Sequence, residues 1–140
     1  MSYFQSKQVS AKSIQTVREQ VEGLLKKEGF GILTEIDIQA TMKKKLDKAY
    51  APFLILGACN PVFADKVLQI DPQISTLLPC NVVIREIGSE KYDVSVMDPK
   101  TAMAVVNNPE IESFAAEVRE KLMNVLKGLN SSGIGIWFKY

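Results

Sequence analysis

Two cysteines, each followed by an asparagine, are the residues of this sequence with the clearest potential for chemistry. Cys59-Asn60 precedes Pro61, where an apolar segment turns into a predicted helix, and Cys80-Asn81 follows a Leu-Pro turn at the start of a predicted strand. Both pairs therefore mark the ends of elements, where backbone groups lack partners and side chains can converge. If the two segments are neighbours in one sheet, the two thiols would line one site.

Three kinds of chemistry are open to these thiols. They could be buried and inert, since free cysteine often behaves as a small hydrophobic residue. Cys59 could instead be a nucleophile, because a helix N-terminus favours the thiolate and lowers its pKa. The third possibility is a soft-metal site, in which Cys59 and Cys80 bind zinc or another soft metal together with carboxylates or a substrate.

The asparagines and one pair of carboxylates are weaker candidates. Asn60 and Asn81 could orient a bound ligand, although asparagine at an element boundary usually bonds nearby backbone. Glu35 and Asp37 share one face of a predicted strand, so they could share a proton or hold a cation, unless that face is simply the wet side of the sheet. Asp98, before a proline, is interpreted as a turn or helix-capping residue.

Composition limits the remaining function classes. Histidine is absent, which excludes Ser-His-Asp and Cys-His nucleophiles and every imidazole metal site. The net charge of +1 gives no broad basic surface, so we expect no nucleic-acid partner. The lysine run at 43–45 is interpreted as a solvated helix face. No apolar stretch approaches the roughly 20 residues of a membrane span, and no secretory signal is visible, so we expect a cytoplasmic protein with reduced thiols.

Periodicity predicts the elements that must position the cysteines. Apolar residues recur at helical spacing after Ser10, the predicted N-cap, and end near Gly29. Asn108-Pro109 begins, and Gly128 ends, a second amphipathic helix. Short helices are expected at 40–46 and from Pro61 onward, with Val62, Phe63, Val67 and Leu68 facing inward. The predicted strands are 3–9, 30–38, 53–59, 81–87 and 92–97, with Ile32, Thr34, Ile36 and Ile38 on one face of the second.

These elements predict one α+β domain over residues 1–130. A mixed, largely antiparallel sheet is expected, with the helices packed mainly on one face. Residues 131–140 form an unusually apolar tail, which we expect to dock on the domain or to lie in an interface.

Four segments resemble the bacterial and archaeal domain-of-unknown-function 302 family. They are 30–37 (FGILTEID), 56–61 (LGACNP), 78–83 (LPCNVV) and 98–99 (DP), in the expected order between Ser10 and Leu126. The resemblance implies a compact α+β fold with helices against a curved, largely antiparallel sheet, and it implies a homodimer. It keeps Glu35 as a secondary ligand-binding candidate and makes it more credible that Cys59 and Cys80 act together. It implies no activity.

The leading hypothesis is therefore a small-ligand or soft-metal binding module centred on the cysteine pair, in a homodimer. Its site would contain Cys59, Asn60, Cys80, Asn81 and Glu35. The first alternative is a thiol-dependent redox or sulfur-transfer enzyme that uses Cys59, and the second is a structural oligomer with buried, inert cysteines. The sequence does not decide whether the protein is an enzyme, nor which ligand or metal it binds.

Overall fold

A five-stranded antiparallel sheet forms the centre of the molecule in the computed structural model, which describes residues 2–129. The order is β1-β5-β4-β3-β2, and each neighbouring pair is antiparallel. The strands are β1 (Phe4–Ser10), β2 (Gly31–Asp37), β3 (Phe53–Cys59), β4 (Cys80–Gly88) and β5 (Lys91–Met97). The predicted α+β class is confirmed, and these strands contain no parallel pair, where a mixed sheet was expected.

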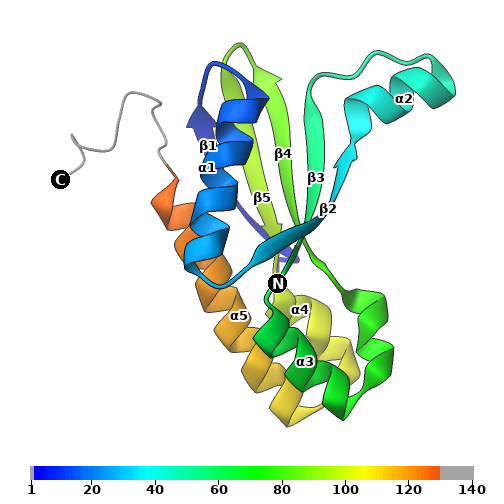
Figure 1. The fold of residues 1–140 in the computed structure, drawn as a ribbon, viewed down its shortest axis with the longest axis vertical. Helices are drawn as coiled ribbons and strands as arrows, with labels where there is room; N and C mark the ends of the chain where they lie inside the picture. The colour runs from blue at the N-terminus through cyan, green and yellow to red at the C-terminus, as the bar shows by residue number, and fades with distance from the viewer. Residues whose placement is uncertain (1, 130–140) are drawn as a thin grey trace.

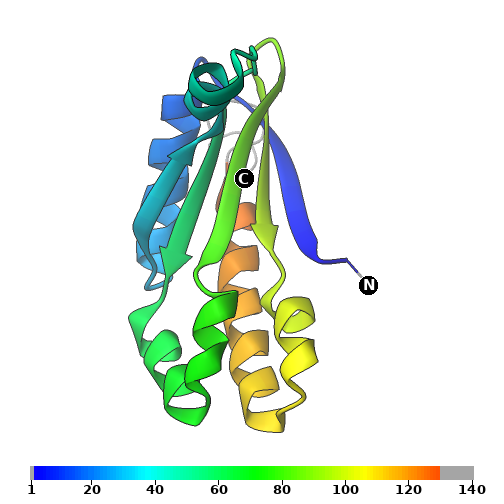
Figure 2. The same cartoon turned by 90° about the vertical axis from the view of Figure 1, so that its right-hand side faces the viewer.

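Two long helices, α1 (Ile14–Lys27) and α5 (Pro109–Gly128), cover one face of this sheet (Figure 1). Beyond one end of the sheet lie α3 (Pro61–Ile70) and α4 (Pro99–Met103), with the 3-10 turns η1 (Pro72–Leu77) and η2 (Ala104–Val106). The helix α2 (Ile38–Leu46) projects beyond the other end and buries none of its residues. The second sheet face, which we call the outer face, carries no helix among the described residues (Figure 2). The predicted one-sided arrangement of helices is thus confirmed.

Local sequence explains where the two long helices begin. Ser13, not the predicted Ser10, is the N-cap of α1, and its hydroxyl accepts from the Thr16 N–H at 3.3 Å. The prediction was wrong because β1 continues through Ser10 and delays the helix by one turn. At α5, Asn108 accepts from the N–H groups of residues 110 and 111, and Pro109 occupies the first turn as predicted.

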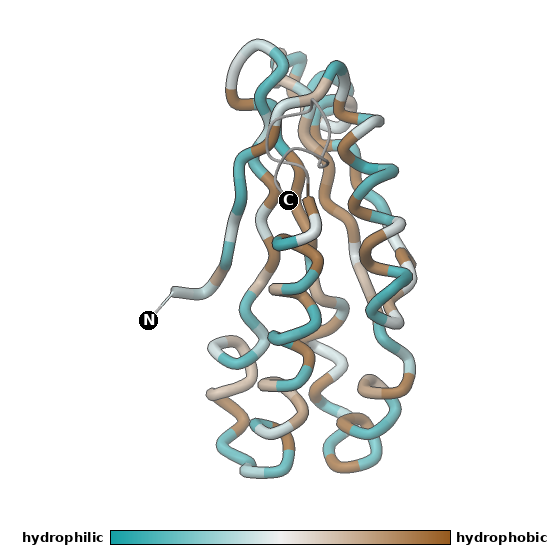
Figure 3. Tube along the Cα trace, turned by 90° about the vertical axis from the view of Figure 1, so that its left-hand side faces the viewer, coloured by the Kyte–Doolittle hydropathy of each residue, from teal (hydrophilic) through white to brown (hydrophobic). Residues whose placement is uncertain are grey.

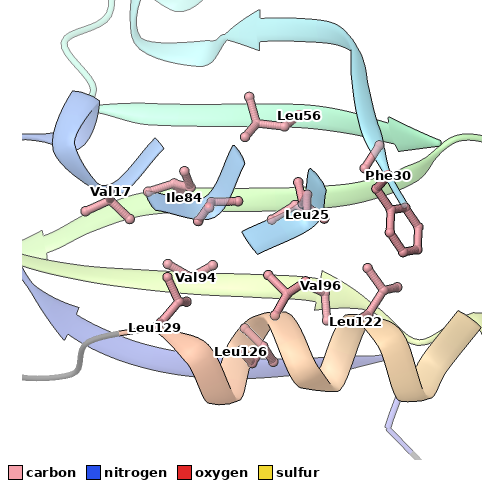
Figure 4. Packing of buried hydrophobic residues seen from close by; sticks show 14 of the residues in the cluster. Val17, Leu25, Phe30, Leu56, Ile84, Val94, Val96, Leu122, Leu126 and Leu129 are labelled. Carbon is pink, nitrogen blue, oxygen red and sulfur yellow. The ribbon is translucent and has the colours of Figure 1, made fainter. Parts of the chain in front are cut away.

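The core lies between the sheet and these two helices. Both helices contain hydrophobic and hydrophilic residues within each turn (Figure 3). The buried ones recur at helical spacing, so each helix presents an apolar stripe to the sheet. Figure 4 shows side chains from the helices interleaved with side chains from β3, β4 and β5. The most buried large residues of this core are Val17, Val21, Leu25, Leu56, Val82, Ile84, Val94, Leu122 and Leu129.

The orientations of side chains in β2 and α3 differ from the prediction in two places. A bulge in β2 pairs Ile32 with Ala58 but Thr34 with Gly57, so Ile32 and Thr34 lie on opposite faces. The prediction that side chains alternate strictly between the two faces from Ile32 onward was therefore wrong. Val62 was expected to face inward and is 62% exposed, because the buried side of α3 is set by Val67.

The expectation for the tail 131–140, and the end of the predicted domain at residue 130, lie outside the described residues.

Candidate functional site

The two cysteines lie on the wall of one apolar cavity of about 50 Å³ at the end of the sheet. The cavity is formed where β3 ends and β4 begins, and α3 and the N-terminal half of α5 line it. Aromatic and aliphatic side chains make up most of its wall, among them Phe30, Phe63, Met103, Ile111, Phe114 and Val118. Such a wall favours apolar ligands, because it offers few hydrogen bonds.

Asn60 fixes the geometry of the wall next to Cys59. Its Oδ1 accepts from the Phe63 N–H at 3.5 Å and caps α3, and its Nδ2 donates to the Glu28 carbonyl oxygen at 3.3 Å. Gly29 has a φ of +85°, and a Cβ there would come within 3.0 Å of the same Nδ2. Both polar ends of the Asn60 amide are thus bonded to backbone, which joins α3 to the turn after α1.

The two cysteines have pairing partners on different strands of the sheet. Cys80 is opposite Ala58 in the pairing of β3 with β4, whereas Cys59 is opposite Gly31 of β2. Cys80 is 7% exposed, Cys59 is half-buried, and both are free thiols. They share a cavity wall without being a directly facing pair, so the expected cysteine pair is not formed as a bonded or coordinating couple.

Burial controls the charge of both thiols. It raises the pKa of Cys59, and it raises the pKa of Cys80 to about 11, with a smaller contribution from negative charge on Cys59. Both groups are therefore protonated near pH 7. The start of a helix was expected to lower the pKa of Cys59, but the pKa is raised instead, by the loss of water around the sulfur.

Residues 2–129 contain no group of three or more Cys, Asp, Glu or His side chains placed to hold one metal ion. A zinc site takes four ligands, of which Cys59 and Cys80 would supply two. The cavity wall adds no carboxylate to them. The donor set therefore suits zinc poorly, since the thiols would also have to lose their protons in apolar surroundings.

The other two candidate residues lie away from this cavity. Asn81 is exposed and faces the outer side of the sheet. Glu35 accepts from Arg18 Nε at 2.7 Å, and Arg18 also pairs with Glu22 at 2.9 Å. Asp37 caps α2 by accepting from the N–H of residue 40. Cys59, Asn60 and Cys80 therefore line one cavity, although the two cysteines are not close together, and Asn81 and Glu35 lie outside it.

Sequence reasoning missed the aromatic part of the cavity wall. The rings of Phe63 and Phe114 meet edge to face with centroids 6.2 Å apart, and Lys66 Nζ lies 5.6 and 5.5 Å from the two centroids. A cation placed over two rings holds them in one arrangement. Phe63 was expected to face inward from its helix, but no spacing in the sequence indicated that it meets Phe114.

Thiol labelling should distinguish the two cysteines. We expect Cys59 to react with a neutral disulfide reagent roughly tenfold faster than Cys80 in the folded protein, because it is more accessible and Cys80 has the pKa of about 11. Cys59→Ser and Cys80→Ser variants assign the two rates, and labelling in urea should make the rates equal. Equal rates in the folded protein would contradict this placement of the thiols.

The comparisons with known proteins identify the domain by family and fold. A family model described as "Domain of unknown function DUF302" matches residues 5–129. A solved structure described as an uncharacterized conserved DUF302 protein from Bacillus stearothermophilus has a TM-score of 0.84 and 25% identity, and the match covers 91% of this chain and 98% of that chain. No curated protein matches this chain. Among the described residues, none of the helices is both long and apolar enough to cross a bilayer.

Proposed function

The chain belongs to the DUF302 family, a domain of unknown function, and we propose that it binds a small apolar molecule in the cavity beside Cys59. The observation that carries this proposal is the cavity itself: an apolar space beside both cysteines, at the junction of the sheet with α3 and α5. An apolar pocket lined by side chains from five separate elements has the form that small-molecule sites usually take.

The volume limits what can bind. About 50 Å³ exceeds the space for one water but is about a third of the 150 Å³ cavity that takes up benzene or xenon. A ligand that fits without rearrangement has roughly four non-hydrogen atoms. At no more than about 1.5 kcal/mol per atom, its dissociation constant would be no tighter than about 40 μM.

The state of the thiols supports an uncharged ligand rather than the alternatives. Neutral thiols are polarizable and donate hydrogen bonds weakly, which suits an apolar or sulfur-containing molecule. A redox or sulfur-transfer role for Cys59 would require a thiolate near pH 7, and burial raises its pKa. Zinc would need ligands beyond Cys59 and Cys80. The homodimer stays a prediction.

Filling the cavity tests the proposal. In Ala115→Val, two methyl groups enter the cavity from α5, whereas Ala116→Val adds the same groups on the exposed side of the same helix. Xenon is the probe, because its binding needs only apolar space and is measured by the shift of its NMR signal. We expect the wild type and Ala116→Val to bind xenon and Ala115→Val to bind it severalfold more weakly.

The rate at which Cys59 reacts with a small apolar thiol gives a second measurement on the same variants. A small apolar thiol such as propanethiol can be captured on Cys59 as a mixed disulfide under mild oxidation. This mixed disulfide should form more slowly in Ala115→Val than in Ala116→Val. If both variants bind xenon as the wild type does, the cavity is not the binding site and the proposal is wrong.

A further inference from the structure

One end of the sheet has a cluster of lysines, which we call the basic tip. It consists of three segments: α2 with the loop after it (38–50), the corner between β1 and α1 (11–13) and the turn between β4 and β5 (87–91). The Ala11 N–H donates to the Glu90 carbonyl oxygen at 3.0 Å, which joins the corner to the turn. The Glu86 N–H donates to the Pro52 carbonyl oxygen at 3.0 Å, which joins the loop after α2 to β4. The three segments therefore lie together at the end of the molecule opposite α3 and α4 (Figure 1, Figure 2).

Cations outnumber anions at the basic tip. It contains six lysines and two acidic residues, Asp47 and Glu90, although the whole chain has 17 basic and 16 acidic side chains. Lys43 Nζ pairs with Asp47 at 2.6 Å, and Lys12 Nζ lies 3.9 Å from Glu90. The remaining lysines of the tip have no carboxylate partner among residues 2–129: Lys44, Lys45, Lys48 and Lys91.

The opposite end of the molecule is acidic. The segments 61–77 and 99–112, which form α3, η1, α4, η2 and the start of α5, contain Asp65, Asp71, Glu110 and Glu112 against Lys66 and Lys100. Two further carboxylates, Asp37 and Glu86, lie at the base of the tip, where they cap α2 and accept from the Tyr92 hydroxyl. They reduce the local charge without pairing with the lysines of the tip. This separation of charge turns the molecule tip first toward an anionic surface.

Exposed apolar side chains lie among these lysines. Leu46 is 62% exposed on α2, Ile87 is 41% exposed near the end of β4, and Tyr50 is 38% exposed in the loop after α2. The nine residues of α2 include no buried one. A helix this short is marginal in water without packing, so a surface that covers Leu46 would stabilise it.

The apolar residues of α2 follow one side of the helix. Ile38, Met42 and Leu46 are four residues apart and form a stripe, with Lys43 and Lys45 on its two sides. The first two are half-buried against the domain, and Leu46 continues the stripe beyond it. Lysines in these positions can hold their ammonium groups in water while their stems and the leucine enter an apolar layer.

We propose that the basic tip binds peripherally to the surface of a bilayer that contains anionic phospholipids. Its lysines attract the headgroups, and Leu46, Ile87 and Tyr50 enter the boundary between headgroups and acyl chains. A nucleic acid fits less well, because the tip contains no arginine and exposed leucine and isoleucine gain nothing from phosphates. The cavity beside Cys59 lies at the other end of the sheet, so this proposal does not depend on the proposed function.

Sedimentation with vesicles measures this binding. In about 50 mM salt, we expect at least about tenfold stronger partitioning onto phosphatidylcholine vesicles with about 30% phosphatidylglycerol than onto phosphatidylcholine alone. Salt at about 500 mM should remove most of this difference, because it screens charges more than about 4 Å apart. Equal partitioning onto both kinds of vesicle, or onto neither, would overturn the proposal.

Lysine variants assign the binding to the tip. Each lysine near an anionic bilayer strengthens partitioning about fivefold, so Lys44→Gln/Lys45→Gln/Lys48→Gln should partition about 100-fold more weakly than the wild type. Lys26→Gln/Lys27→Gln/Lys100→Gln removes the same charge from exposed lysines outside the tip and should retain most of the binding. Circular dichroism checks that both variants are folded. Equal losses in the two variants would mean that net charge, and not the tip, determines binding, and the proposal would be wrong.

Leu46→Asn distinguishes a bilayer from a soluble anionic partner. Leu46 on the tip and Val62 on α3 are both 62% exposed, so Val62→Asn is a matched control. We expect Leu46→Asn to partition severalfold more weakly at unchanged charge, and Val62→Asn to partition as the wild type does. An oligodeoxythymidylate is the competing probe. Vesicle binding unchanged in Leu46→Asn, or tighter binding of the oligonucleotide than of the anionic vesicles, would assign the tip to a soluble polyanion and overturn the proposal.

Discussion

Replacing Asp98 with alanine is expected to lower the free energy of unfolding by about 3 kcal/mol. Asp98 is 4% exposed, and its carboxylate accepts from Arg119 Nε at 2.9 Å and from Gln5 Nε2 at 3.3 Å. It also accepts from the backbone N–H groups of Lys100 at 3.0 Å and Thr101 at 3.4 Å. One side chain thus joins β1, the end of β5, α4 and α5.

The size of this effect follows from what alanine leaves behind. Arg119 loses the carboxylate that it faces, and the first N–H groups of α4 lose their cap. Breaking a buried ion pair costs about 3–5 kcal/mol, and losing an N-cap costs about 1 kcal/mol. The side chain of Arg119 is 35% exposed, so water can replace part of the lost interaction, which places the expected total at the low end.

Urea unfolding at pH 7 measures the loss, and two variants control it. Asp65→Ala removes an exposed aspartate that bonds only to Gln69 on its own helix, and it should change stability by less than about 0.5 kcal/mol. Asp98→Asn retains one acceptor oxygen, which can still cap α4, but loses the charge and the second acceptor, so it should fall between the wild type and Asp98→Ala. A loss in Asp98→Ala no greater than that in Asp65→Ala would contradict the role assigned to this carboxylate.

The same carboxylate gives stability a defined pH dependence. Burial by itself raises the pKa of Asp98, but hydrogen bonds from Arg119, Gln5 and the Thr101 backbone, with the charge of Arg119, outweigh burial and lower it. A lowered native pKa contributes stability that is fully present above the unfolded value of about 3.9 and is lost as pH falls through the native value. The stability difference between the wild type and Asp98→Ala should therefore shrink below about pH 4.

Gly57→Ala is expected to lower the free energy of unfolding by about 2–3 kcal/mol. Gly57 lies in β3 between Thr34 of β2 and Asn81 of β4. A Cβ at this position would overlap Thr34 Oγ1 and would come within 2.7 Å of Pro79 Cγ. The proline ring belongs to the cavity wall, so the strain would reach the loop before Cys80.

Gly23→Ala is the matched control, because the same methyl group meets nothing there. Gly23 is exposed in α1, and a methyl group on its Cα would have no heavy atom within 4 Å apart from its chain neighbours and its own helix backbone. Alanine should raise stability there by about 0.5–1 kcal/mol, since it restricts the unfolded chain and favours the helix. Thermal or urea unfolding of both variants should give shifts of opposite sign.

A double variant locates the cause at Gly57. Thr34→Ala removes the hydroxyl that the new methyl would overlap, so Gly57→Ala/Thr34→Ala should be more stable than the two single losses predict. If the losses are additive, the clash with Thr34 is not the reason.

The sequence by itself determined most element positions. The apolar run 53–59 became β3, and the signals at Asn108-Pro109 and Gly128 became the ends of α5. Capping residues and periodicity act over a few neighbours, so they can be recognised in one segment at a time. The error at Ser10 is of the same local kind, since Ser13 offers an equally good cap one turn later.

Tertiary structure decided which of the candidate residues meet. The cavity joins residues as far apart as Phe30, Cys59, Cys80 and Phe114, and no spacing within one segment encodes that meeting. Alternation along β4 carries Asn81 to the outer face while Cys80 stays inside, and an ion pair with Arg18 holds Glu35 at the side of α1. The sequence could identify the thiols as the available chemistry. Only packing, by removing water from around them, raised their pKa values and so moved them further from the thiolate form.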